Sequence, residues 1–138
     1  MGLRGVKAHT DRLKFMASPA VEKLVTQALF VGAETIAVAA QLSITLGAVS
    51  GKAHVPSKPG EPPNQDTGVL AGNIEATRAG RLKALVTSSA DYAAALEFGT
   101  SRMAARPYMR PARDKKKAEV RDLVSKALKV AVRNSRSK

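Results

Sequence analysis

The chain has 138 residues, enough for one domain with a hydrophobic core, and we expect residues 1–138 to form a single domain. It has no cysteine, which excludes disulfides and thiolate metal sites, and its two histidines, His9 and His54, lie far apart in the sequence. The formal net charge is +12, and residues 102–138 carry most of it, with thirteen Lys or Arg against three Asp or Glu. This imbalance indicates an anionic partner, either nucleic acid or an acidic protein surface, or else a solvated helix face. We expect no cofactor.

The first predicted element is a long helix. Residues 1–17 mix glycine with charge and are expected to be flexible, with at most a short helix. Ser18 and Pro19 are typical of a helix start, and apolar residues recur at helical spacing as far as Ala40, which predicts a helix of 25 residues or more. A small sheet should cover one side. The opposite side of the helix carries little charge, so we expect it to be covered as well. Either a neighbouring subunit covers it, or the helix is central to its own domain.

This stretch also has to be considered as a membrane span, because Glu34 is its single charge between Leu24 and Gly51. Ala, Gly, Ser, Thr and Gln dominate it, and a Glu in mid-segment costs several kcal/mol in hydrocarbon. No apolar run with a cleavage pattern typical of a secretory signal precedes it. We therefore expect no membrane partner.

Residues 47–66 predict an extended loop. They contain four prolines and three glycines, a composition that favours a stiff arm, which we expect to reach an adjacent subunit. The triplet Asp66-Thr67-Gly68 also occurs in aspartic proteases, but prolines precede it here in place of an apolar strand. Asp66 or Thr67 is therefore expected to cap a turn.

Two strands are predicted next, Asn73–Ala79 and Leu82–Ser88, joined around residues 79–81. Ile74 should face inward in the first strand. In the second, the alternation leaves two possibilities, Leu82 with Val86 or Leu85. The apolar face of this hairpin should lie on the long helix.

Residues 91–113 hold three of the five aromatic residues. Tyr92, Leu96 and Phe98 are spaced as one face of a short helix that Gly99 ends at positive φ. Because proline restricts both itself and the residue before it, residues 106–111 predict an extended strap. Tyr108 lies in it beside Met109 and between arginines, a composition typical of protein interfaces, although both side chains could instead attach the strap to the protein's own core.

A basic amphipathic helix is expected from Ala112 to about Arg133, with residues 134–138 flexible. Its apolar stripe includes Val120, Leu123 and Val124. Residues available for an anionic partner are Lys115, Lys116, Lys117 and Arg121. Taken together, these elements predict an α+β fold with a long N-terminal helix on a small antiparallel sheet, a long proline-rich loop and a C-terminal basic helix.

Two groups of motifs, in this order, resemble the tail-completion or neck (head–tail joining) proteins of long-tailed bacteriophages. The first comprises residues 51–54 and 59–64, Asp66-Thr67-Gly68, Leu70 and Ile74, and the second Tyr92-Ala93, residues 96–100 and residues 106–112. The sparse charge of the long helix and Ala71-Gly72 after Leu70 depart from the family pattern.

The resemblance implies a structural virion protein at the head–tail junction, made in the host cytoplasm. It would form a homo-oligomeric, six-fold ring that joins the tail tube to the head connector. Its neighbours would be head-connector or stopper proteins and tail-terminator or tail-tube proteins, with possible contact to packaged DNA. The residues implied in subunit or partner contacts are Pro59, Pro62, Pro63, Asp66, Thr67, Gly68, Leu70, Tyr92, Glu97, Phe98, Gly99, Thr100, Arg106, Pro107, Tyr108, Met109, Arg110 and Pro111.

The alternative function is a small basic DNA-binding architectural protein, in which residues 106–111 supply an apolar wedge beside a lysine-rich helix. The sequence has no pairing of a nucleophile with a base, no metal-ligand spacing and no phosphate-binding glycine loop. Glu97 could be imagined as a general acid, but nothing near it in sequence would tune it. We therefore expect no enzyme activity.

Overall fold

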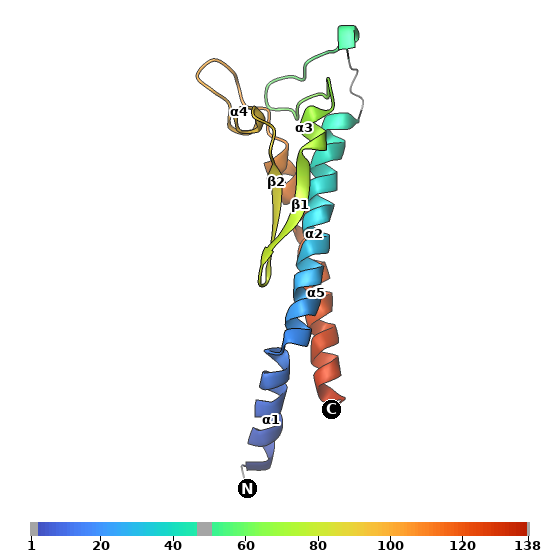
Figure 1. Cartoon of the computed structure of the whole chain (residues 1–138), viewed down its shortest axis with the longest axis vertical. Coiled ribbons are helices and arrows are strands. Elements are labelled where there is room, and N and C mark those ends of the chain that lie inside the picture. The colour runs from blue at the N-terminus through green and yellow to red at the C-terminus, as the bar shows by residue number, and fades with distance from the viewer. Residues whose placement is uncertain (1–2, 47–50, 138) are drawn as a thin grey trace.

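The structure is a computed structural model, and it describes residues 3–46 and 51–137. Two long helices, α2 and α5, lie side by side along an elongated body, and a two-stranded hairpin packs beside α2 (Figure 1). The α+β class, with a long helix on a small antiparallel sheet and a C-terminal helix, is confirmed. The described elements are α1 (Leu3–Met16), α2 (Pro19–Thr45), η1 (Gly51–Ala53), α3 (Val69–Gly72), β1 (Ile74–Gly80), β2 (Lys83–Ser88), α4 (Ala93–Phe98) and α5 (Met109–Arg136).

The long helix α2 begins where the sequence predicts, with Pro19 in its first turn and Ser18 in the N-cap position. The Ser18 hydroxyl, however, makes no capping hydrogen bond and finds no partner within the described residues. Proline needs no N–H partner in the first turn of a helix, so the start is stable without that bond.

Both ends of the chain are more helical than predicted. The segment expected to be flexible forms α1, and α5 continues to Arg136, beyond the predicted end at Arg133. Leu, Lys and Arg are frequent in α1 and favour helix even where little packs against them, and residues 134–136 add less than one turn to a helix that is already formed. A single turn joins α1 to α2, with the N–H of Ser18 donating to the carbonyl oxygen of Phe15 at 2.9 Å.

The hairpin register decides between the two inward patterns. Ala76 pairs with Val86 and Ile74 with Ser88, so these residues share the face that packs on the core. Leu85 points to the other face and is 42% exposed. Leu82 lies in the turn at φ 50° and is also exposed, so Val86 is the one inward-facing residue of those predicted for the second strand.

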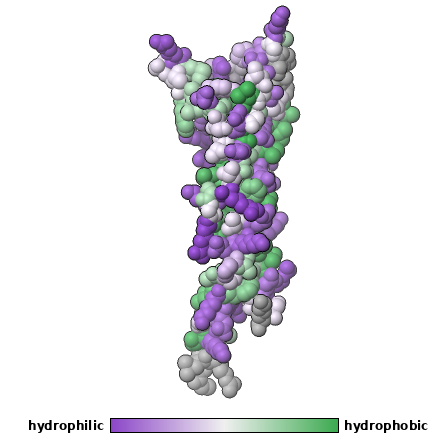
Figure 2. All heavy atoms as spheres, viewed as in Figure 1, coloured by the Kyte–Doolittle hydropathy of each residue, from purple (hydrophilic) through white to green (hydrophobic). Residues whose placement is uncertain are grey.

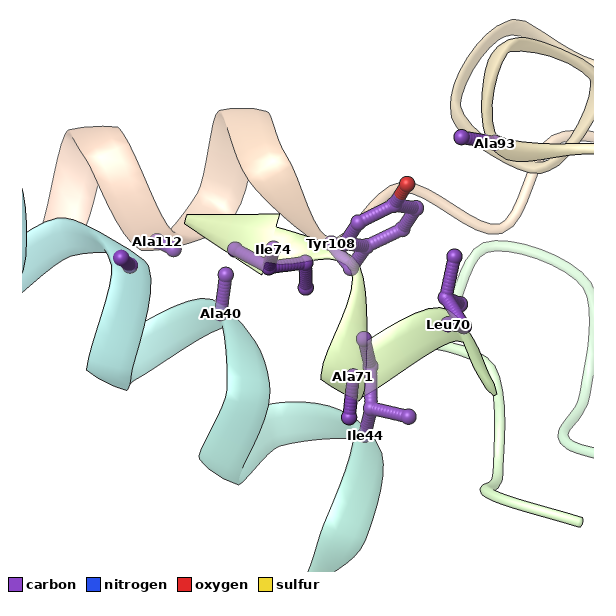
Figure 3. Packing of buried hydrophobic residues seen from close by; sticks show 9 residues of the cluster. Ala40, Ile44, Leu70, Ala71, Ile74, Ala93, Tyr108 and Ala112 are labelled. Atoms are coloured by element: carbon purple, nitrogen blue, oxygen red, sulfur yellow. The ribbon is translucent and has the colours of Figure 1, made fainter. Parts of the chain in front are cut away.

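The core lies at the end of the body where α2, α3, β1 and α5 meet (Figure 3). It is built mainly from small side chains around Ile44 and Tyr108, both at most 1% exposed. Small residues also bring α2 and α5 together, since a Cβ atom placed on Gly32 would lie 2.8 Å from Val120 Cγ1. The buried members of the cluster are Ala37, Ala40, Ile44, Leu70, Ala71, Ile74, Ala93, Tyr108 and Ala112.

Much of α2 is left without a full cover. By length and composition it could cross a membrane, a test that core helices of soluble proteins also pass, and 28% of its most apolar window is buried. Figure 2 shows hydrophobic side chains at the surface along much of the molecule. Such surfaces in a small protein are typical of contacts with other molecules.

Candidate functional site

Glu97 holds the start of α5. Its Oε2 atom accepts hydrogen bonds from the backbone N–H groups of Tyr108 at 2.9 Å and Met109 at 3.0 Å, and its Oε1 atom accepts one from Arg110 at 2.9 Å. The first N–H groups of a helix have no partner inside the helix and carry partial positive charge, so a carboxylate is their best cap. Glu97 thus joins α4 to α5, and its carboxylate is fully engaged in the fold.

The predicted extended strap is therefore wrong in its second half. Tyr108 is the N-cap residue of α5, and residues 109–111 form the first helical turn. Proline breaks a helix in its interior, but Pro111 fits here because its missing N–H would have had no partner within the helix. Residues 106–107 precede the helix, and the N–H of Arg106 donates to the carbonyl oxygen of Leu96 at 2.6 Å.

Tyr108 is buried in its own chain, so its side chain is not free to anchor a partner. This supports the alternative prediction, in which Tyr108 attaches this segment to the protein's own core. Its hydroxyl donates to Ser88 Oγ at 2.8 Å, and Figure 3 shows its ring among Ile74, Leu70 and Ala93. Burial raises the pKa of the Tyr108 hydroxyl above its ordinary value because the phenolate would lose its hydration, while the hydrogen bond with Ser88 acts in the opposite direction.

The proline-rich loop also folds back on its own chain. Residues 47–50, where the predicted loop begins, lie outside the described residues. Beyond them, Asp66 Oδ1 accepts a hydrogen bond from the N–H of Gly51 at 3.0 Å, and the N–H of Gly60 donates to the carbonyl oxygen of Ala105 at 2.9 Å. Pro63 is buried. The described part is thus an anchored loop with an exposed tip, and its expected reach to an adjacent subunit stays a prediction.

Asp66 or Thr67 was predicted to cap the turn that leads into Val69 and Leu70, whereas Asp66 accepts a hydrogen bond from the N–H of Gly51 across the loop. The N-cap residue of α3 is Gly68, at φ 82°, and no side chain bonds there. This left-handed conformation favours glycine, so the turn before α3 explains why glycine ends the triplet Asp66-Thr67-Gly68. Leu70, two residues on, is buried in the core and is excluded as a contact residue.

Gly99 ends α4 at positive φ, as predicted, with φ 75°. A Cβ atom placed there would lie 2.9 Å from the nitrogen of Ala105 and 2.9 Å from the oxygen of Met103. The following loop therefore packs closely against this glycine. Phe98, just before it, is left 72% exposed, and Tyr92 at the other end of α4 is 45% exposed.

Of the eighteen predicted contact residues, about half remain at the surface. Those buried or tied into the fold are Pro63, Leu70, Glu97, Gly99 and Tyr108, and the half-buried ones are Pro62, Gly68, Arg106, Pro107 and Met109. The exposed ones are Pro59, Asp66, Thr67, Tyr92, Phe98, Thr100, Arg110 and Pro111. Both motif groups lie at the same end of the molecule, around α3 and α4 (Figure 1).

A pocket of about 290 Å³ opens between the proline-rich loop and α4. Arg106 and Ser57 line it, and neither the Nε atom of Arg106 nor the Ser57 hydroxyl has a hydrogen-bond partner among the described residues. The Nε–H of Arg106 is an unused donor, and an arginine donor forms a charge-assisted hydrogen bond with a carboxylate. The pocket could thus receive an acidic side chain.

A second hollow, here called the hairpin groove, holds about 470 Å³ and is mostly apolar. Its floor is α2, one wall is β2, and the other is formed by α4 and the start of α5. Phe98 stands at its edge. Its lining residues are Leu29, Ala33, Ile36, Ala84, Leu85, Val86, Glu97, Phe98, Met109, Arg110, Arg113 and Val120.

A third surface, here called the α2 ridge, consists of Val31, Val38 and Leu42, which are 36%, 50% and 46% exposed. Residue-level prediction missed it, although the low charge of α2 had indicated that one side needs a cover. The signal was the spacing of seven and four residues, which places these side chains on one stripe of the helix. Thr35 and Ala39 continue the stripe, and Glu34 lies at its edge.

The four basic residues predicted for an anionic partner do not form one patch. Consecutive helical residues are rotated by about 100°, so Lys115, Lys116 and Lys117 point in three directions. Lys117 and Arg121 share a face. Lys116 is half-buried and pairs with Glu119 at 3.1 Å. Four residues further on do form one exposed stripe, with spacings of three and four: Lys126, Lys129, Arg133 and Arg136.

Within the described ranges, no group of three or more His, Asp or Glu side chains could hold a metal ion. Comparison with protein-family models, curated protein sequences and solved structures gives no match to this chain. Any function assigned to this chain therefore rests on the pockets and surfaces described above and on the motif resemblance. That resemblance stays a prediction.

Proposed function

We propose that this chain is a structural protein of the head–tail junction of a long-tailed bacteriophage. In this proposal its copies form a ring of six-fold symmetry that joins the tail tube to the head connector, and it catalyses no reaction. The observation that carries the proposal is the pair of motif groups, which occur in the family's order over residues 51–112.

The contacts around these motif groups support it. The groups are far apart in sequence but lie together at one end of the molecule, where the Gly60–Ala105 hydrogen bond joins the proline-rich loop to the segment before α5. The Glu97 carboxylate then fixes this end to α5. The two motif groups therefore build one structural unit. A unit whose residues position one another would be retained as a whole, in agreement with the resemblance to neck proteins.

In this proposal the buried motif residues build a rigid end, and the exposed ones contact neighbouring proteins. Phe98 and Tyr92 are the exposed aromatic residues of this end, and the exposed Arg110 lines the hairpin groove together with Phe98. Aromatic side chains and arginine contribute most to protein interfaces because they bury large areas at a small entropy cost. Rigid loops reduce the cost further.

Deletion of the gene from the phage that carries it tests the proposal. We expect infected cells to accumulate DNA-filled heads and complete tails that do not join, visible by negative-stain electron microscopy. Wild-type protein supplied from a plasmid should restore joined particles. Joined, infectious particles in the deletion strain would refute the proposal, as would absence of the protein from purified particles.

A matched pair of variants in the same complementation assay locates the contact. Phe98→Asp places a charge on the most exposed aromatic residue of the motif end and should abolish joining. Val6→Asp makes the same change at a 58% exposed position of α1, away from the motif residues, and should restore joining. Both variants should have wild-type circular dichroism, since neither side chain is buried.

The second candidate function is binding to double-stranded DNA, and the basic stripe at the end of α5 favours it. The side chains of Lys126, Lys129, Arg133 and Arg136 are exposed and form no ion pair among the described residues. Phosphate contacts by such a stripe would make the affinity fall steeply with salt. This is compatible with a neck ring that touches packaged DNA.

Fluorescence anisotropy with a labelled duplex separates the two candidates. If the stripe binds DNA, replacing its four cations by Gln should lower the slope of log K against log salt by about 3 to 4. The matched control replaces Lys7, Arg12, Lys52 and Lys58, which are exposed and lie outside α5. Equal slopes for both variants would exclude the stripe as a DNA site.

A further inference from the structure

Two apolar surfaces of this protein have no cover in the described part of the chain. One is the α2 ridge, and the other is the hairpin groove. At the groove edge Leu85 is 42% exposed, within the range of the ridge residues, and Phe98 is 72% exposed, above that range. Apolar side chains at such exposure, gathered on two separate surfaces, indicate two binding faces.

The two surfaces lie on opposite sides of α2. Leu29 on the groove floor precedes Val31 of the ridge by two positions, and Ile36 precedes Val38 in the same way. Two positions correspond to a rotation of about 200° around a helix. A single partner patch could not reach both.

We propose that the α2 ridge of one subunit docks in the hairpin groove of the next copy of this chain, head to tail. Contact of ridge with ridge would leave both grooves open, whereas the head-to-tail contact covers both surfaces of every subunit and repeats until a ring closes. The contact deepens the proposed neck ring and rests on that proposed function.

Charge favours the same arrangement. Glu34, at the edge of the ridge, is exposed and has no ion pair among the described residues. Arg110 and Arg113 line the groove, and among the described residues Arg113 is paired with the exposed Asp114 next to it. Copies with a net charge of +12 repel each other, so a contact that brings opposite charges together is favoured over one that does not. Docking of the ridge in the groove brings Glu34 toward the two arginines.

A lipid surface fits the ridge less well. Lys116 lines the shallow hollow beside the ridge together with Glu34, and a bilayer that covered the ridge would have to take up both charged groups. Ionised groups in hydrocarbon cost several kcal/mol each. A protein groove with two arginines at its edge solvates the carboxylate instead.

Cross-linking of single-cysteine variants tests the contact directly, because the natural sequence has no cysteine. Val38→Cys marks the ridge and Leu85→Cys marks the groove. When the two variants are mixed and treated with a short bismaleimide, we expect covalent dimers, whereas each variant alone should remain monomeric on a denaturing gel. A chain that carries both cysteines should give a ladder that ends at a fixed number of subunits.

The controls use positions of matched exposure outside both surfaces. Val6→Cys on α1 (58% exposed) replaces the ridge cysteine, and Leu128→Cys on α5 (40% exposed) replaces the groove cysteine. Mixtures that contain either control should give no dimer above the background of random collision. The proposal is overturned if Val38→Cys cross-links to itself as readily as to Leu85→Cys, or if the mixture gives no dimer at the highest soluble concentration.

Charge reversal gives a second readout. Glu34→Lys should lower the cross-linking yield of the mixed pair by about tenfold or more, the effect of losing one close charge pair, and Glu34→Gln should lower it less. Combining Glu34→Lys in one partner with Arg110→Glu and Arg113→Glu in the other should recover the yield. Failure to recover, with both proteins folded by circular dichroism, argues against the proposed pairing.

Flotation with vesicles of phosphatidylcholine and phosphatidylglycerol tests whether the α2 ridge binds lipid instead of a second copy. Flotation that Val38→Asp abolishes, together with no cross-linked dimer, would assign the ridge to lipid and overturn the proposal. The gene-deletion experiment is independent of these results. Joined particles in the deletion strain would refute the neck function, but a positive cross-link would still support the contact between copies. Absence of the cross-link would refute that contact and would not bear on the neck function.

Discussion

The carboxylate of Glu97 binds the backbone of Tyr108 across the junction between α4 and α5, with 2.9 Å between Oε2 and the amide nitrogen. Together with the bonds to the next two residues, it caps the longest of the described helices and fixes the end where the motif residues lie. Structure and proposed function depend on the same side chain, and its replacement is the first test.

Glu97→Ala should lower the free energy of unfolding by about 2–3 kcal/mol, because three N–H groups lose a charged acceptor. Glu97→Gln keeps one oxygen and the side-chain shape and should cost about 1 kcal/mol. Urea denaturation followed by circular dichroism measures both. Glu75→Ala, at an exposed position of β1, is the control and should change stability by less than about 0.5 kcal/mol. An equally small change for Glu97→Ala would contradict the capping role.

Tyr108→Phe should lower stability by about 1 kcal/mol at neutral pH through loss of the hydrogen bond to Ser88. Its pH dependence should also differ from the wild type. Burial raises the pKa of Tyr108 above 10.0, so above that pH the unfolded chain releases a proton that the native protein retains. Wild-type stability should therefore fall as the pH rises past 10, and the fall should be smaller in Tyr108→Phe.

Urea titrations between pH 8 and about pH 11 measure this difference. Ser88→Ala is the control, since it removes the hydrogen bond but keeps the buried tyrosine, and it should retain the fall above pH 10. A Tyr108→Phe protein with the same slope as the wild type would show that Tyr108 does not remain protonated in the native state.

Gly32→Ala should be destabilising by about 1 kcal/mol, although alanine is the better helix former by about that amount. The added Cβ atom would meet Val120 Cγ1 at 2.8 Å, and the stiff valine side chain cannot move away without shifting α5. In a Val120→Ala background the sign should reverse, so that Gly32→Ala becomes neutral or stabilising. Thermal unfolding of the four proteins of this cycle gives the coupling energy. Additive effects would mean that the helices do not touch at this point.

Arg106→Met should raise stability by about 1 kcal/mol, because methionine keeps much of the apolar stem and removes a buried Nε–H that lacks a partner among the described residues. Arg102→Met, at an exposed position in the same loop, should leave stability within about 0.5 kcal/mol of the wild type. In the complementation assay, Arg106→Met should still fold but join heads to tails less efficiently if the pocket receives an acidic side chain. A loss of stability would show that the guanidinium is satisfied within the chain.

Local signals were sufficient for the long helix, the hairpin and most of the C-terminal helix, but they missed α1 and the short helix α3. The capping position at Ser18, the proline after it and the apolar repeat predicted α2, and the alternation around Ile74 predicted the hairpin. Gly99 was predicted at positive φ because little else ends a short helix in that way. These signals arise within a few residues, so one sequence is enough to recognise them. The resemblance to neck proteins was also available at this level, since it rests on residue order.

Tertiary structure decided which side chains are free to bind. Tyr108 had the composition of an interface anchor, but the small residues around it leave room for its ring, and burial of that ring is favourable. Glu97 had no neighbour in sequence to bind, and its partners are brought to it only when α4 meets the start of α5. The separation of ridge and groove likewise depends on which sides of α2 the hairpin and α5 cover. Sequence determined local conformation through short-range sterics and periodicity, whereas exposure depends on contacts between distant segments.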